Sequence, residues 1–325
     1  MMTFPKLKLK TLGLALATSA LIATQASAAD IAVIAGSAQD AFFNKIKRGV
    51  DDAALVVEAN GGTVTYLTVA NYDNFGPDLV GLINTAVSQG VDGIAIPIWV
   101  PEAQVPALQA AAAAGIQIMM YNSGDDKAGE VGAINYFGNN EYTAGVAGGE
   151  YLAEHGAKRI LCVIHVPGAI NLETRCDGVT EGATPAGAEI IRLPLQANLD
   201  GNMAGTSEAI KAELLRDPTI DAVIMLAAGG ADAAAIAIEQ AGMGATVQLG
   251  SFDMNQAGLD RIKAGTQAMA IDQQPYLQSF LAVTMLAVKI DYGLDLATDP
   301  ILTGPAIIDA TNVDATLAGV AAGLR

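Results

Sequence analysis

Polar and aromatic side chains follow several of the predicted strands, at positions where they could bind a small molecule. In chain order these residues are Asp40, Phe42, Phe43, Trp99, Asn122, Ser123, Asp253 and Gln273. Ligands of open parallel sheets bind beyond the carboxyl ends of the strands. The residue types suit a neutral polyhydroxy ligand, because carboxylates and amides hold hydroxyl groups while aromatic rings cover apolar C–H faces.

Each of these residues also has a purely structural interpretation. Asp40 and Asp253 could each cap the helix that follows them. The two phenylalanines could be a core pair at a helix start, Trp99 could pack under a loop, and Gln273 could make a hinge hydrogen bond. The residue types alone leave both interpretations open.

An enzymatic site is the competing class, and the sequence offers little for it. His155 and His165 are the two histidines of the chain. Cys162 and His165 are three residues apart, so on a strand their side chains point to opposite faces. We find no phosphate-binding loop and no metal-ligand spacing, and the glycines of residues 145–149 lie in a helical pattern that favours close helix packing. We therefore predict a binding protein rather than an enzyme, with no cofactor and no metal.

Residues 1–28 have the pattern of a signal peptide. Lys6, Lys8 and Lys10 precede an uncharged apolar stretch at residues 12–23, and Ala26-Ser27-Ala28 gives the small-x-small pattern of a cleavage site. The apolar stretch is too short to span a bilayer comfortably. The sequence therefore predicts export to the periplasm, with cleavage after Ala28.

The cysteine and charge content agree with an exported, ligand-binding protein. Cys162 and Cys176 are the two cysteines, and in an oxidising compartment they predict one disulfide, with two buried free thiols as the alternative. The formal net charge is −17. Such a surface repels phosphate backbones and anionic lipids, so nucleic acid and membrane surfaces are excluded as partners.

Short apolar runs alternate with helix-length segments along the chain. Because the runs are continuously apolar, they predict parallel strands buried on both faces, and the alternation predicts doubly wound α/β lobes. The expected strands are residues 31–34, 63–67, 93–96, 117–120, 133–137, 159–164, 189–193, 222–225, 248–251 and 268–272. The expected helices are residues 43–60, 80–89, 105–114, 143–155, 207–215 and 231–242, and a last helix and strand are expected at 275–291 and 305–308.

The alternation pauses near Asn139-Asn140, which indicates a boundary between two lobes. The tail must then return to complete both lobes. We expect an N-terminal lobe of residues 29–138 plus 274–303 and a C-terminal lobe of 139–273 plus 304–325. The lobes would be joined by a multi-strand hinge, with a ligand cleft between them. We expect Asn139 to contact the ligand, with a turn residue of the lobe crossing as the alternative.

Four segments, in order and spacing, resemble the periplasmic sugar-binding proteins of the ribose-binding type. They are residues 36–43 (GSAQDAFF), 122–124 (NSG), 251–253 (SFD) and 271–275 (IDQQP). Proteins of this type are the capture subunits of ABC importers. The resemblance covers essentially the whole chain after residue 28, and it implies two α/β lobes that close on a ligand.

The resemblance also implies roles for individual residues. The two phenylalanines match the family's ring-sandwiching aromatic pair, and Asp40 matches a hydroxyl-binding polar residue. Arg175 matches an arginine at the start of a second-lobe helix. The family's acidic and amide ligands from the second lobe and hinge fall on Asp253 and Gln273.

Three departures from the ribose binders bear on the ligand. Asn122 and Ser123 stand where those proteins carry an Asp-Arg pair, Ala228-Gly229-Gly230 lacks the usual second-lobe asparagine, and Trp99 adds a large apolar face. We expect a neutral monosaccharide or polyol as ligand, an ABC permease of the inner membrane as partner, and a monomer. The alternatives are a nucleoside or other larger ring, and a sensor subunit that presents its ligand to a chemoreceptor or kinase.

Overall fold

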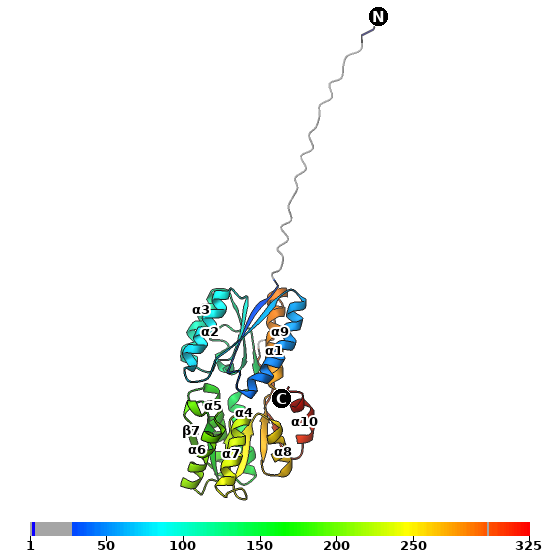
Figure 1. Ribbon diagram of the computed structural model, residues 1–325. Coiled ribbons are helices and arrows are strands. Elements are labelled where there is room, and N and C mark those ends of the chain that lie inside the picture. The colour runs from blue at the N-terminus through cyan, green and yellow to red at the C-terminus, as the bar shows by residue number, and fades with distance from the viewer. Residues whose placement is uncertain (1, 4–27, 298) are drawn as a thin grey trace.

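The computed structural model describes residues 2–3, 28–297 and 299–325. Residues 4–27, which make up most of the predicted signal peptide, lie outside the described residues. The described chain forms two α/β lobes, one above the other in Figure 1, with α1 and α9 in the upper lobe and α5–α8 in the lower one. None of the helices described is long and apolar enough to cross a membrane.

The first lobe is built on a six-stranded, entirely parallel sheet with the order β11-β5-β4-β3-β1-β2. Its strands are β1 (Asp30–Ala35), β2 (Thr63–Thr68), β3 (Gly93–Ile96), β4 (Gln117–Asn122), β5 (Tyr136–Gly138) and β11 (Ile301–Leu302). Its helices are α1 (Ala41–Ala59), α2 (Phe75–Gln89), α3 (Pro101–Ala113) and α9 (Pro275–Tyr292). Strands β1 and β3 are buried almost throughout, as expected for a sheet covered by helices on both faces.

The second lobe repeats the plan, with the strand order β12-β10-β9-β8-β6-β7, and only β12 runs antiparallel to its neighbour. Its strands are β6 (Arg159–Ile164), β7 (Glu189–Pro194), β8 (Ala222–Met225), β9 (Gln248–Phe252), β10 (Met269–Asp272) and β12 (Ala306–Ile308). Its helices are α4 (Glu141–Glu154), α5 (Ile170–Ala183), α6 (Met203–Arg216), α7 (Ala228–Gln240), α8 (Gln256–Ala264) and α10 (Leu317–Ala321).

The predicted fold class is confirmed, and most predicted elements lie within a few residues of the observed ones. The predicted strands at 93–96, 159–164 and 222–225 have the observed bounds. Helix α3 begins four residues earlier than predicted, at Pro101, because proline is well suited to the first turn of a helix. Helices α5, α8 and α10 and the two-residue strand β11 were not among the predicted elements.

The chain passes between the lobes at three places. It leaves the first sheet after β5 and enters the second lobe at α4, returns between β10 and α9, and crosses again between β11 and β12. The crossing segments are therefore residues 139–140, 273–274 and 303–305. Three adjacent crossings make a hinge that restricts how the lobes can move relative to one another.

Helices α4 and α5 pack unusually close together because glycines line both sides of their contact. A Cβ atom on Gly145 would lie 2.2 Å from the carbonyl oxygen of Arg175, and one on Gly149 would lie 2.3 Å from that of Val179. On the facing helix, a Cβ atom on Gly178 or Gly182 would meet backbone oxygens of α4 at 2.2 Å. This contact confirms that the glycines of residues 145–149 serve helix packing.

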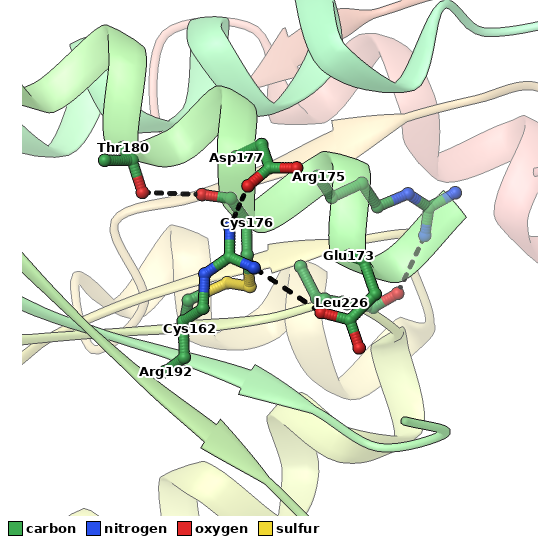
Figure 2. Close-up of a disulfide and its surroundings, with 8 residues drawn as sticks. All are labelled: Cys162, Glu173, Arg175, Cys176, Asp177, Thr180, Arg192 and Leu226. Atoms are coloured by element: carbon green, nitrogen blue, oxygen red, sulfur yellow. Dashed lines mark hydrogen bonds and ion pairs between the residues drawn. A yellow bond between two sulfur atoms is a disulfide. The ribbon is translucent and has the colours of Figure 1, made fainter. Parts of the chain in front are cut away.

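Cys162 and Cys176 form a disulfide, which confirms the predicted bond over the free-thiol alternative. Figure 2 shows that it joins strand β6 to helix α5, with Arg175 extending from the helix toward the carbonyl of Leu226. Both cysteines are fully buried. The bond therefore fixes the position of α5 on the sheet, one residue away from Arg175.

Replacing both cysteines by alanine should lower the free energy of unfolding by about 3 kcal/mol, because the unfolded chain regains the freedom of a loop that the disulfide had closed. Alanine suits the buried positions, so little else changes. The measurement is urea unfolding of the oxidised protein and the double variant, with reductant as the control. Reductant should destabilise the unsubstituted protein and leave the variant unchanged. Equal unfolding midpoints for the oxidised protein and the variant would contradict the prediction.

Candidate functional site

A cavity lies between the two lobes, with about 480 Å³ of empty space including the part that is open to solvent. Its lining residues lie at or after the carboxyl ends of β3, β4, β6, β8, β9 and β10 and in the first two turns of α1, α2 and α5 or just before them. Of the residues proposed from sequence, those that line it are Asp40, Phe42, Phe43, Trp99, Asn122, Arg175, Asp253 and Gln273.

Ser123 and Asn139, the other two proposed ligand residues, do not line this cavity. The Ser123 hydroxyl is buried and donates to the Ile98 carbonyl oxygen at 2.6 Å, which ties the end of β4 to the segment after β3. Asn139 is buried in the first crossing, and its Oδ1 lies 2.5 Å from where a Cβ atom on Gly304 would be. Its position is that of a crossing residue, which was its structural interpretation.

The first lobe presents a continuous wall of five aromatic side chains. Phe43 meets the edges of both Phe42 and Trp99, with ring centroids 5.2 and 5.5 Å apart. Phe75 stacks on Trp99 at 5.2 Å, and Tyr72 meets the edge of Phe75 at 4.8 Å. Tyr72 and Phe75 were absent from the sequence proposals, although Tyr72 lies just beyond β2 and the strand-end rule applied to that strand would have included it.

Arg175 is the most strongly constrained side chain of the second lobe. Its Nε and Nη2 donate to Glu141 at 2.6 and 3.1 Å, its Nη1 donates to the Leu226 carbonyl oxygen at 3.0 Å, and the guanidinium stacks 4.4 Å over the Phe252 ring. A further bond runs from Nη2 to Gln273 Oε1 at 2.9 Å. A guanidinium has five N–H donors, so these four bonds to described residues leave one N–H of Nη1 for a ligand.

Asp253 and Gln273 continue this network. Gln273 Nε2 donates to Asp253 Oδ1 at 2.6 Å, which leaves the second carboxylate oxygen without a hydrogen bond from the described residues. Asp253 holds a left-handed backbone conformation, with φ of 63°. Aspartate tolerates this conformation better than most residues, and strained residues of this kind cluster at ligand-binding sites.

Two first-lobe residues combine a structural bond with exposure to the cavity. Asp40 caps α1 by accepting from the Phe42 backbone N–H at 2.9 Å, and it also accepts from the Tyr72 hydroxyl at 3.1 Å. Asn122 has a φ of 64°, accepts from Trp99 Nε1 and donates to Gln278 Oε1, both at 3.3 Å. The capping interpretation of Asp40 therefore holds together with its place in the cavity wall.

Asn171 and His165 line the cavity with unsatisfied polar atoms. Asn171 is 8% exposed, and its Oδ1 has no hydrogen-bond partner among the described residues. It lies one helical turn before Arg175 on α5, so both side chains share a face. His165 Nδ1 is likewise buried without a described partner. Neither residue was proposed as a ligand contact from sequence, although His165 directly follows the predicted strand 159–164.

Burial sets the protonation states at the site. It raises the pKa of Asp253 to about 6, although Arg175 and Lys45 pull in the opposite direction, and it raises the pKa of Asp40 as well. Burial and the Arg175 charge lower the pKa of His165 to about 4, so the imidazole is neutral at pH 7. With Arg175 balanced by Glu141, the site carries excess negative charge, which disfavours anionic ligands.

Residues 31–293 match the family model for the periplasmic binding protein domain. The chain belongs to this family. Among solved periplasmic binding proteins, it is similar to a carbohydrate transporter from Acidothermus cellulolyticus in complex with myo-inositol, with 33% identity, a TM-score of 0.83, and coverage of 91% of this chain and 99% of that one.

Two further relatives are more distant. An ABC transporter solute-binding protein from Burkholderia graminis in complex with D-arabinose has 24% identity, a TM-score of 0.75, and coverage of 88% of this chain and 97% of that one. The xylose/arabinose-binding protein XylF of Sulfolobus acidocaldarius is 26% identical over 74% of this chain. The present chain spans 61% of the length of XylF.

Asp253→Asn should stabilise the ligand-free protein at pH 8 while weakening ligand binding. The folded-state pKa of about 6 lies above the ordinary value of 3.8, so ionisation of Asp253 costs stability as pH rises from 4 through 6. Asparagine tolerates the left-handed conformation and cannot ionise. The variant should gain about 1–3 kcal/mol at pH 8 and nothing near pH 4.

Thermal unfolding between pH 4 and 8 measures this effect, with Asp260→Asn on the exposed face of α8 as the matched control. The control should track the unsubstituted protein at every pH. If the Asp253→Asn variant is less stable than the unsubstituted protein at pH 8, the raised pKa of Asp253 in the folded protein is wrong.

Proposed function

We propose that this protein is the substrate-binding subunit of an ABC importer and captures a neutral monosaccharide or polyol between its lobes. The observation that carries the proposal is the division of the cavity wall. The first lobe supplies all five aromatic rings together with Asp40 and Asn122. The second lobe supplies hydrogen-bonding groups with unused capacity on Asn171, Arg175 and Asp253. A hydroxylated ring has the two kinds of surface that match these walls.

The similar proteins support the same ligand class. The Acidothermus protein is described with myo-inositol and the Burkholderia protein with D-arabinose, and the Sulfolobus protein is named for xylose and arabinose. All of these compounds are uncharged and rich in hydroxyl groups. A neutral ligand also agrees with the negative charge of the cavity, because it requires no basic counterpart.

Capture follows from contacts that the two lobes make with each other. The Ile170 backbone N–H of α5 donates to the Trp99 carbonyl oxygen at 2.8 Å. Elsewhere along the cleft, Lys45 Nζ of α1 donates to the Met254 carbonyl oxygen at 2.6 Å. A ligand that touches both walls adds to these bonds only when the lobes are closed, so it shifts the population toward the closed form. That form would be the one that the permease recognises.

The remaining parts of the proposal concern the protein outside the cleft. We propose that the chain is exported, that its signal peptide is cleaved after Ala28, and that it acts as a monomer without catalytic activity, nucleic acid or membrane lipid. The disulfide supports an oxidising compartment, since such bonds persist there. Both sulfurs are consumed by that bond, so neither cysteine offers a nucleophile.

Asn171→Ala should weaken ligand binding about tenfold without loss of stability, because one hydrogen bond to the ligand is removed and the side chain has no other described partner. Asn84→Ala, on the exposed face of α2, is the matched control and should change nothing.

Isothermal titration calorimetry with myo-inositol, D-arabinose, D-xylose, D-allose and adenosine tests both the variant and the function. Binding of adenosine alone would replace the sugar proposal by a nucleoside one. No binding of any compound would overturn the proposal. Equal affinities of the Asn171→Ala variant and the unsubstituted protein would remove Asn171 from the site.

Lys45→Met should lower ligand affinity several-fold by removing a bond that only the closed form makes. Methionine keeps most of the length and apolar volume of the lysine stem. Lys47→Met is the control, because Lys47 lies on the same helix and pairs with Asp51 at the surface. Small-angle X-ray scattering should show a larger radius of gyration for ligand-free Lys45→Met than for the control. An unchanged radius and affinity would contradict a closing role for Lys45.

A further inference from the structure

A second and larger space borders the cavity. It holds about 1310 Å³ of empty space, part of it open to solvent. We call it the outer chamber and the 480 Å³ cavity the inner chamber. Five residues border both: Asp40, Phe42, His165, Ala227 and Asp253. The two chambers therefore lie side by side, with Asp40 of the first lobe and Asp253 of the second at their common border.

The two chambers differ in chemistry. Of the five aromatic residues that line the inner chamber, only Phe42 borders the outer one. The outer chamber is instead bordered by polar side chains from both lobes, including Gln39, Asn71, Asp200, Asn202, Thr206 and Asn255. Amides, hydroxyls and carboxylates of this kind form hydrogen bonds with hydroxyl groups. The outer chamber thus fits a second hydroxylated group better than an apolar ring.

The start of helix α7 leaves space for such a group. Ala228, Gly229 and Gly230 border the outer chamber. A Cβ atom on Gly229 would meet no atom within 4 Å, and Gly229 does not hold a left-handed conformation. No backbone or packing requirement in the described structure therefore calls for glycine at 229. Its small size keeps open a volume that a larger side chain would fill.

The charges of the outer chamber exclude one common class of sugar derivative. Asp40, Asp200 and Asp253 border it, against a single lysine, Lys45, whose Nζ already donates to the Met254 carbonyl. A phosphate group there would face carboxylates at close range, which is strongly unfavourable in a partly buried site. The second group is therefore not an anion.

We propose that the outer chamber is a subsite for a second sugar or polyol ring, so that the protein binds neutral disaccharides and glycosylated polyols as well as single rings. This inference rests on the proposed function, because the first ring occupies the inner chamber. The glycosidic link passes between Asp40 and Asp253. The polar side chains of the outer chamber then bind the hydroxyl groups of the second ring.

Gly229→Leu tests the inference, because Gly229 borders the outer chamber and leucine is compatible with a helix. Gly81→Leu is the matched control, since Gly81 is an exposed glycine within helix α2 whose Cβ atom would also meet nothing. Titration calorimetry of the unsubstituted protein and both variants should use two sets of ligands. The single rings are D-glucose, D-xylose and myo-inositol, and the paired rings are cellobiose, xylobiose and galactinol.

We expect at least one paired-ring ligand to bind within about tenfold of its single ring. Gly229→Leu should weaken binding of the paired-ring ligand at least tenfold and leave the affinity for the single ring unchanged. Gly81→Leu should change neither affinity. Binding of single rings with no binding of any paired ring overturns this inference and leaves the proposed function standing. Equal weakening of both ligand sets by Gly229→Leu also overturns it. Failure of both sets to bind would reject the proposed function itself.

Discussion

The ion pair between Arg175 and Glu141 is the interaction on which the binding cleft depends. Both side chains are 3% exposed. A buried ion pair is expensive to desolvate and is weak evidence for stability by itself. Its value here is geometric. Glu141 accepts hydrogen bonds from Nε and Nη2 of Arg175. These bonds fix the guanidinium, which also donates to Gln273 and lines the cavity.

The position of this ion pair is determined by backbone packing well outside the cleft. Glu141 begins α4 and Arg175 lies on α5, so their separation is set by how closely the two helices approach. Gly145 contacts the backbone of Arg175 itself, and the disulfide at Cys176 holds the same turn of α5 to the sheet. The close helix contact and the disulfide therefore also position Arg175 at the cavity, besides any contribution to stability.

The strand-end rule predicted most of the site because parallel sheets bring the carboxyl ends of their strands to one edge. It failed where the decisive contact depends on tertiary packing. Asn171 and Glu141 lie on the first turns of helices, and nothing in their local sequence shows which way those turns face. Ser123 directly follows a strand, as the rule requires, but its hydroxyl donates a hydrogen bond to the Ile98 carbonyl oxygen. The rule finds the correct edge of the sheet and cannot tell which of two adjacent residues faces the ligand.

The ligand site and the hinge share the same hydrogen-bond network, which explains how occupancy can control closure. Gln273 contacts Arg175 and Asp253 through its side chain, while its backbone oxygen accepts from Thr303 Oγ1 at 2.7 Å in the third crossing. Gln278 Nε2 donates to that same oxygen at 3.0 Å, and Gln278 Oε1 accepts from Asn122. The second and third crossings are thus bonded to groups that face the cavity from both lobes. We expect a ligand bound to Asn122 and Gln273 to restrict the hinge as well, because both residues belong to the hydrogen-bond network of the crossings.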